Sequence, residues 1–192
     1  GTDVGALMIY DRTLDKFQVV NDSATSIKSR LFCQAEDKDG SFWLGTLGGG
    51  LLRFHPDTKK FTQYQFNQND RNSIPDNYVV GLVFDSTGKL WVGTTGGLSS
   101  YDPQTNKFIR YDLLNKNPDD TYRYRVIRSM LLSKNKLYLS TYGGLQIFDI
   151  VTNKSEHLIH DDKDPNSLSH NSLFQAVENP DGTFWIASYG DR

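Results

Sequence analysis

A block built around a large aromatic residue and a glycine-containing turn recurs four times along this chain. It reads FWLGTLGGG from Phe42, LWVGTTGG from Leu90, LYLSTYGG from Leu137 and FWIASYG from Phe184. The large aromatic stands at Trp43, Trp91, Tyr138 and Trp185, at intervals of 48, 47 and 47 residues. A fixed period of this size indicates an array of stacked supersecondary units, and it constrains the architecture before any single residue suggests a chemistry.

A second aromatic series extends the array to the start of the chain. It consists of the residues that follow the glycine turn, namely Tyr10, Phe54, Tyr101 and Phe148, at intervals of 44, 47 and 47 residues. The repeat therefore fills the chain. Gly1 and Thr2 align with Gly45 and Thr46, so we expect the sequence to begin midway through a unit.

Each unit has the sequence pattern of four short strands. In the unit that starts at Val79, segments rich in Val, Leu, Thr and aromatic residues alternate with the turns STGK, GG and PQTNK. Residues such as Asp39-Gly40 and Asp102-Pro103 supply the backbone angles that tight turns need. A β-sandwich of unrelated hairpins does not keep a constant period, whereas four strands per unit of about 40 to 50 residues are typical of a β-propeller.

The predicted fold is all-β, with propeller blades of four antiparallel strands in about four repeats of ~47 residues. We expect the last two strands of one blade, three complete blades and the first two strands of a further blade, sixteen in all. The expected ranges within the single region 1–192 are 1–20, 26–66, 74–112, 121–160 and 168–192. Unpaired terminal strands would expose long sheet edges. We therefore expect a fragment of a larger propeller, with pairing of two copies through blade edges as a consequence.

Composition is consistent with a compact all-β body. Hydrophobic residues make up 37% of the chain and aromatic residues 12%, and we expect the repeated rings to pack between blades. The net charge is −2 and there is no basic stripe, which argues against a nucleic-acid partner. Cys33 is the single cysteine, so it has no partner for an intramolecular disulfide. No apolar stretch is long enough to cross a membrane, so the chain is expected to be cytosolic or part of something longer.

The unit from Asn72 to Tyr111 resembles the two-component regulator propeller repeat. The specific parts are the lead-in N-S-[LI]-x-x-N, the block D-x-x-G-x-[LF]-W-[VIL]-G-T and the turn D-P-x-T-x-x-F; the lead-in appears at 72–77 and again at 166–171. The resemblance covers the whole chain. It implies a piece of a seven-bladed periplasmic sensor region from a hybrid two-component system histidine kinase, whose parent is anchored in the inner membrane. Ligands in that family are often oligosaccharides, which implies control of polysaccharide-utilisation genes.

The third repeat departs from this pattern. Its lead-in is replaced by Thr121-Tyr122-Arg123-Tyr124-Arg125, and Arg128 follows at the position that Gly81 and Gln175 hold in neighbouring units. The loop that enters the inner strand and the loop between the second and third strands emerge on the same face of a propeller blade. The candidate ligand-binding residues on this face are Asp76, Asn77, Tyr122, Arg123, Tyr124, Arg125, Arg128, Tyr142, His170, Asn171 and Tyr189.

These residue types suit a carbohydrate ligand. Aromatic rings offer flat apolar faces to sugar C–H groups, while Arg, Asn and Asp form directed hydrogen bonds with hydroxyls, and Arg also pairs with the carboxylates of acidic sugars. Structural roles are the alternative: Asn77 and Asn171 can satisfy local backbone groups in Asx-turns, and Tyr or Arg can pack over blade edges. We favour the structural role for the two asparagines and leave both roles open for 122–125.

Catalysis, metals and cofactors have little support in the sequence. Of the four histidines, we expect only His170 on the proposed face, and no HxxxH, HExxH, nucleophile-elbow or phosphate-loop motif is present. Asp37 and Asp39 hint at calcium, but the loop lacks the later ligands, and a hairpin turn explains it better. No catalytic residue, metal or cofactor is therefore expected. Two alternatives stay open: an enzyme like the streptogramin lyases, which have similar propeller repeats, and a protein interaction scaffold.

Overall fold

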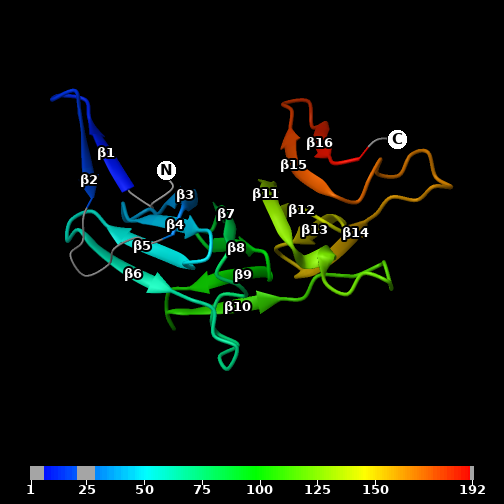
Figure 1. Cartoon of the computed structure of the whole chain (residues 1–192), viewed down its shortest axis with the longest axis horizontal. Coiled ribbons are helices and arrows are strands. Elements are labelled where there is room, and N and C mark those ends of the chain that lie inside the picture. Colours follow the sequence, from blue (N-terminus) through cyan, green and yellow to red (C-terminus); the bar gives the residue numbers. More distant parts are fainter. Residues whose placement is uncertain (1–6, 21–28, 191–192) are drawn as a thin grey trace.

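The computed structural model describes residues 7–20 and 29–190, which form sixteen strands and one short 3₁₀ turn (Figure 1). The strands fall into five antiparallel sheets, each a simple meander in which sequence neighbours pair. The first hairpin is β1 (Leu7–Asp11) and β2 (Lys16–Val20). The three complete sheets are β3 (Leu31–Glu36), β4 (Phe42–Thr46), β5 (Leu51–His55) and β6 (Lys60–Tyr64); β7 (Val79–Phe84), β8 (Leu90–Thr94), β9 (Gly97–Asp102) and β10 (Lys107–Tyr111); and β11 (Ile127–Ser133), β12 (Lys136–Thr141), β13 (Gly144–Asp149) and β14 (Lys154–Leu158). The last hairpin is β15 (Leu173–Glu178) and β16 (Phe184–Ser188). The prediction of propeller blades with four antiparallel strands is confirmed.

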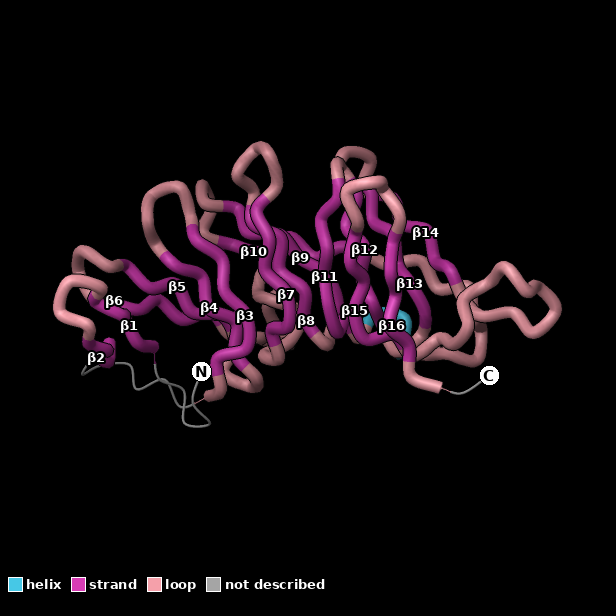
Figure 2. The backbone as a smooth tube through the Cα atoms, turned by 90° about the horizontal axis from the view of Figure 1, so that it is seen from above, coloured by secondary structure: helices cyan, strands magenta, loops and turns pink. Residues whose placement is uncertain are grey.

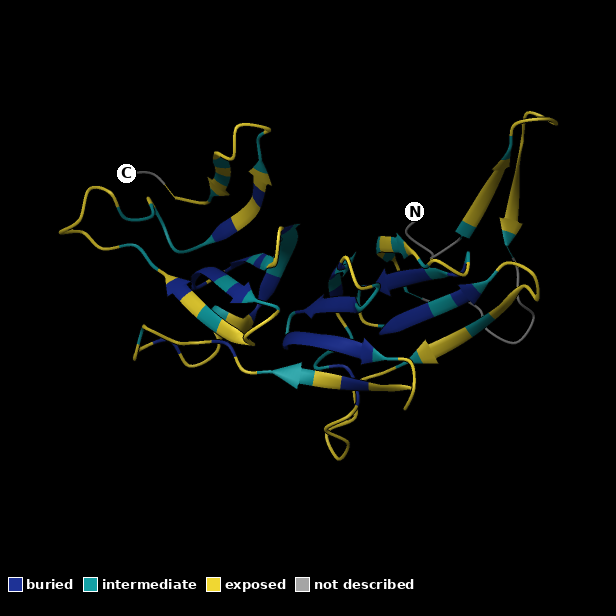
Figure 3. Cartoon of the chain, turned by 180° about the vertical axis from the view of Figure 1, so that it is seen from behind, coloured by how far each residue is buried: buried dark blue, intermediate teal, exposed yellow. Residues whose placement is uncertain are grey.

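The blades stand side by side along an arc. The first strands of successive sheets contact one another, β3 with β7, β7 with β11 and β11 with β15, so they form the inner side of the arc. Figure 2 shows the strands of neighbouring blades side by side, with loops at both of their ends. The hairpins β1–β2 and β15–β16 lie at the two ends of the arc, and Figure 3 shows more exposed residues there than in the central sheets.

The repeated aromatic residues pack between blades. The rings of Trp43 on β4 and Tyr101 on β9 have centroids 4.7 Å apart, and those of Trp91 on β8 and Phe148 on β13 are 5.6 Å apart. Trp43 and Trp91 are fully buried. The residue at the same position of the last hairpin, Trp185, is 70% exposed, because the described part of the chain places no blade against it. The period in the sequence is therefore the period of inter-blade packing.

In the first two complete blades, the aspartate at the start of the hairpin turn anchors the tryptophan that follows. Asp85 accepts a hydrogen bond from the Trp91 indole at 2.9 Å, and Asp37 accepts one from Trp43 at 3.1 Å. Asp37 and Asp39 also both pair with the guanidinium of Arg53, at 3.2 and 2.6 Å. These two carboxylates therefore close a hairpin turn, and no group of residues suited to a metal ion occurs among residues 7–20 and 29–190.

One sequence alignment is corrected by the strand register. In all four inner strands the pairing slips by one residue, which leaves Phe32, Val80, Arg128 and Phe174 as the inserted residues. Arg128 is therefore level with Val80 and Phe174, and not with Gly81 and Gln175 as its spacing from the motifs predicts. A β-bulge adds one residue to a strand and redirects its side chain. Arg128 is thus the single charged member of an otherwise apolar set.

Candidate functional site

The lead-in loops and the glycine turns meet on one rim of the arc. The backbone N–H groups of Gly48 and Gly50 donate to the carbonyl oxygen of Asn77 at 3.1 and 2.9 Å, which joins the turn of one blade to the lead-in of the next. Within the last hairpin, the backbone N–H of Tyr189 donates to the carbonyl oxygen of Ser172 at 2.8 Å, which joins its turn to its own lead-in. A side chain at Gly50 would clash with the Tyr64 carbonyl, since a Cβ would lie 2.2 Å from it. The predicted convergence of these two sets of loops is therefore found in the structure.

The two regular lead-ins use their polar residues to hold the backbone. The Asn77 side chain accepts from the Phe66 N–H at 2.8 Å, and the Asn171 side chain accepts from the His160 N–H at 2.6 Å. Asp76 and His170 each accept from the N–H two residues later, at 2.8 and 2.9 Å. The Asp76 and His170 bonds are local and of the Asx-turn kind, whereas the two asparagines each hold a backbone N–H eleven residues earlier. All four side chains thus have a structural task whether or not a ligand binds.

The irregular third lead-in forms the 3₁₀ turn, η1 (Arg123–Arg125). The buried carboxylate of Asp120 accepts from the N–H groups of Tyr122 and Arg123 at 3.0 and 2.6 Å, and this fixes the start of the turn. Tyr124 points toward the blade core, where its ring lies 6.4 Å from that of His157. Tyr122 and Arg123 remain exposed, because residues on opposite sides of a tight turn diverge.

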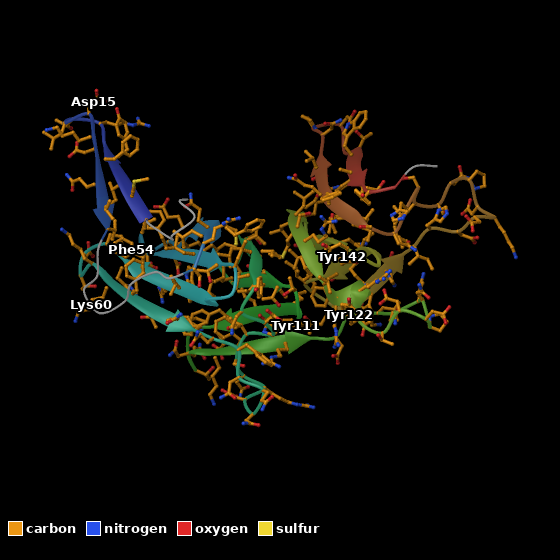
Figure 4. All side chains as sticks on the ribbon, viewed as in Figure 1. Asp15, Phe54, Lys60, Tyr111, Tyr122 and Tyr142 are labelled. Atoms are coloured by element: carbon orange, nitrogen blue, oxygen red, sulfur yellow. The ribbon has the colours of Figure 1, made fainter. Side chains whose placement is uncertain are left out.

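A pocket of about 530 Å³ opens between this turn, the glycine turn of the same blade and the next lead-in. We call it the loop pocket, and its lining residues are Tyr122, Arg123, Tyr142, His160, His170, Asn171 and Ser172. Figure 4 shows the labelled Tyr122 and Tyr142 on the same part of the third blade. The lining contains two phenol rings, one guanidinium, two imidazoles and no acidic residue. Its volume is in the range of small-ligand sites, about 300–1,000 Å³.

The structure brings together five of the predicted residues and adds two. Tyr122, Arg123, Tyr142, His170 and Asn171 line the loop pocket, whereas Asp76, Asn77, Tyr124, Arg125, Arg128 and Tyr189 do not. The prediction that His170 is the only histidine on this face is wrong, because His160 lines the pocket too. Its ring nitrogens lie 2.6 Å from the Leu168 carbonyl and 2.9 Å from the Asp162 carboxylate. Both ring nitrogens of His160 therefore already have oxygen partners.

His160 was missed because it stands six residues before the repeated lead-in motif, which begins at Asn166. A signal does exist, since His160 and Phe66 occupy equivalent places: the N–H of each is held by the lead-in asparagine of its repeat. The asparagine folds the lead-in back over this residue in both blades. The side chain of His160 therefore lies beside the rim where the lead-ins and glycine turns meet.

Arg128 lines a second, neighbouring hollow on the inner side of the arc. This inner cavity measures about 640 Å³, and among its lining residues are Phe32, Val80, Arg128, Phe174 and Tyr142. Tyr142 is shared with the loop pocket. Of the remaining predicted residues, Tyr189 packs edge-on to Phe174, with ring centroids 6.1 Å apart.

His157 is a structural histidine. It is fully buried, its Nδ1 accepts from the Lys116 N–H at 3.0 Å, and its Nε2 therefore carries the proton that faces the Gly143 carbonyl at 2.8 Å. Burial lowers the pKa of this imidazole, against the opposing effect of the Gly143 bond. In the first complete blade the Gln63 amide holds the Gly49 carbonyl in the same way, at 2.8 Å. The His157 ring thus stabilises the glycine turn that carries Tyr142.

Comparison with known proteins gives one family match. The model of the two component regulator propeller family matches residues 73–96, which include the lead-in and the tryptophan block of the second complete blade. Histidine kinase P4 of Formosa agariphila is 31% identical over 68 residues, which amount to 35% of this chain and 5% of that protein.

Solved structures agree on the fold. The extracellular domain of the putative hybrid two component system BT3049 from B. thetaiotaomicron matches 97% of this chain with a TM-score of 0.69 and 21% identity. That of BT4673 from the same organism matches 96% with a TM-score of 0.74 and 23% identity. Virginiamycin B lyase from Staphylococcus aureus matches 96% with a TM-score of 0.67 and 15% identity. The matched parts are 28%, 24% and 57% of those chains, so this chain spans only a fraction of the first two.

Proposed function

We propose that the chain is an array of two-component regulator propeller repeats, of the kind carried by the sensor regions of hybrid two-component systems, and that it senses a ligand in the periplasm. The ligand that the loop pocket suits best is an oligosaccharide. In this proposal the parent protein is a histidine kinase anchored in the inner membrane, and ligand-driven rearrangement of the propeller controls genes for polysaccharide use. Within the described residues, no helix has the length and apolar character required to span a membrane.

The lining of the loop pocket is the observation that carries this proposal. Tyr122 and Tyr142 are 55% and 45% exposed, so large parts of both aromatic rings are free to cover the apolar faces of sugar rings. Arg123 and the histidines supply donors for hydroxyl or acidic groups, and no acidic side chain in the lining repels an anion. Acidic sugars are therefore included in the proposed ligand class.

Binding without catalysis is supported by the histidines. His170 Nδ1 accepts from the Ser172 N–H, and both nitrogens of His160 are close to oxygen acceptors, so three of the four ring nitrogens in the pocket already have partners. A general base needs a free nitrogen within reach of a substrate proton, and of these four only His170 Nε2 has no hydrogen bond to another described residue. The likeness to virginiamycin B lyase, at 15% identity, concerns the fold alone and supplies no argument for lyase chemistry.

The test is calorimetric titration with neutral and acidic oligosaccharides, chosen by a thermal-shift screen. Tyr122→Ala and Arg123→Ala are expected to weaken binding about tenfold or more, since each removes one main contact. Two matched controls sit outside the pocket: Tyr78→Ala, an exposed tyrosine on the preceding lead-in, and Arg125→Ala, an exposed arginine two residues from Arg123. Equal losses in the controls, or no binding of any member of the panel, would contradict the proposal.

A further inference from the structure

The inner cavity contains an arginine whose charge has no protein counterpart among the residues that the structure describes. Arg128 stands at the bulge position of β11, where the other three inner strands carry Phe32, Val80 and Phe174. All four residues line the same cavity. Placing a charged group among these apolar neighbours costs solvation free energy. An arginine at this position therefore needs a functional explanation.

Two aromatic rings contact the guanidinium. Its central carbon lies 3.7 Å from the centroid of the Phe174 ring and 4.4 Å from that of Tyr142. Such stacking favours the cation and fixes the plane of the guanidinium. Tyr189 in turn packs edge-on to Phe174, so this ring is itself supported. The arginine is therefore pre-oriented before any ligand arrives.

Most of the donors of Arg128 remain unused. One terminal nitrogen donates to the Leu173 carbonyl at 3.1 Å, and within residues 7–20 and 29–190 no carboxylate lies within ion-pair distance. A guanidinium has five N–H donors arranged as a planar fork. Apart from the nitrogen bonded to Leu173, the edge of this fork makes no hydrogen bond to another described residue. A planar carboxylate is the group that matches such an edge with two parallel hydrogen bonds.

We propose that Arg128 is the anchor for a carboxylate of the ligand, and that the sensed sugar contains a uronic acid. This inference rests on the proposed function, which it makes more specific. The shared wall at Tyr142 joins the inner cavity to the loop pocket, so one oligosaccharide can place neutral rings beside Tyr122 and its acidic ring beside Arg128. Acid recognition is thereby assigned to Arg128 and not to Arg123.

The experiment is an NMR titration of arginine-labelled protein with galacturonate and, separately, with galactose. The Arg128 Nε–H signal is recognisable because the flanking rings displace it and Arg128→Met removes it. We expect galacturonate to shift this signal and galactose to leave it in place. No shift with either sugar at saturating concentration would overturn the proposal, and equal shifts with both would overturn the carboxylate assignment.

A second measurement separates this inference from the proposed function. Trigalacturonate is compared with its carboxyl-reduced, neutral counterpart by calorimetry, and we expect the acidic trimer to bind about ten- to a hundredfold more tightly. Arg128→Met should remove that preference while Arg123→Met keeps most of it. A purely structural arginine would change the melting temperature and leave the preference intact. If the trimers bind equally, the carboxylate assignment fails and the oligosaccharide pocket stands. If neither trimer binds while galacturonate alone shifts the Arg128 signal, the anchor stands and the pocket fails.

Discussion

Replacing Asp85 with asparagine tests the bond that ties the hairpin turn of the second complete blade to Trp91. One oxygen of Asp85 accepts from the Trp91 indole at 2.9 Å, and the other accepts from the N–H groups of Thr87 and Lys89 at 2.9 and 3.1 Å. The asparagine side chain has only one acceptor oxygen and brings an NH₂ group in place of the other. Either the buried indole or the turn then loses its acceptor.

The expected cost is the penalty for a buried donor left without a partner, about 1–3 kcal/mol. For a chain of this size that corresponds to a fall in melting temperature of about 2–4 °C per kcal/mol. The effect should depend on pH. Burial opposes ionisation of Asp85, but the hydrogen bonds from Thr87 and Trp91 outweigh it and hold the pKa of the carboxyl below its usual range. Its contribution is therefore complete above the unfolded pKa of about 4 and disappears as pH falls through the lower folded value.

The assay is urea unfolding at pH 7 and again near pH 3, where unfolded carboxyls are mostly protonated. Asp181→Asn is the matched control, because Asp181 also accepts from a turn N–H and hydroxyl, those of Thr183, but is exposed and holds no indole. We expect Asp85→Asn to be the less stable variant at pH 7 and its deficit relative to the unmodified protein to shrink in acid. Equal stabilities of the two variants at pH 7 would refute the reasoning.

Four further predictions follow from burial and pairing. Trp91→Ala should cost about 3–5 kcal/mol in unfolding free energy, whereas Trp185→Ala, at a 70% exposed site, should cost less than about 1 kcal/mol; equal costs would contradict inter-blade packing as the origin of the repeat. His157→Gln should keep the bond to the Gly143 carbonyl and reduce the fall in unfolding free energy below about pH 6.5. The reason is that the pKa of His157 is lowered in the folded state, so protonation of the unfolded ring destabilises the fold. An unchanged pH profile from urea unfolding would count against this. Burial raises the pKa of the Cys33 thiol to about 12, so alkylation by iodoacetamide at pH 8 should be far slower in native than in urea-unfolded protein, and similar rates would contradict it. If copies pair through the exposed β16 edge, Trp185→Arg should lower the mass that light scattering measures for the associated species. If the unmodified protein is a monomer at every concentration tested, such pairing is excluded.

The blades were predictable because their signals are local and repeated. Alternating apolar residues, turn residues and a large aromatic residue every 47 or 48 residues each point to the same four-strand unit, and Trp43 and Trp91 occupy the equivalent buried place that the period requires. The convergence of lead-ins and glycine turns was also predictable, since it follows from the blade topology. The loop pocket lies on the rim that the sequence predicts for these loops.

The choice of residues on that rim was less predictable, because it depends on small shifts of the backbone. The hairpin turn after the first strand is one residue shorter in the third complete blade than in the second, so Arg128 shares its level with Val80 and not with Gly81, although both strands carry the same bulge. The 3₁₀ turn sends Tyr124 to the core and Tyr122 outward, although the two belong to one polar run. His160 enters the pocket only because Asn171 folds the lead-in back onto its backbone.

The measurement that tests the central claim most directly is a hydrogen-exchange footprint of the chain with and without the tightest-binding oligosaccharide of the panel. We predict protection in three segments, 120–125, 141–144 and 160–172, which together contain the lining residues of the loop pocket. The hairpin turns at 37–41 and 85–89, which contribute no residue to the pocket, should exchange at an unchanged rate. Protection confined to those turns, or to the outer strands β6 and β10, would contradict the assignment of the loop pocket as the sensing site.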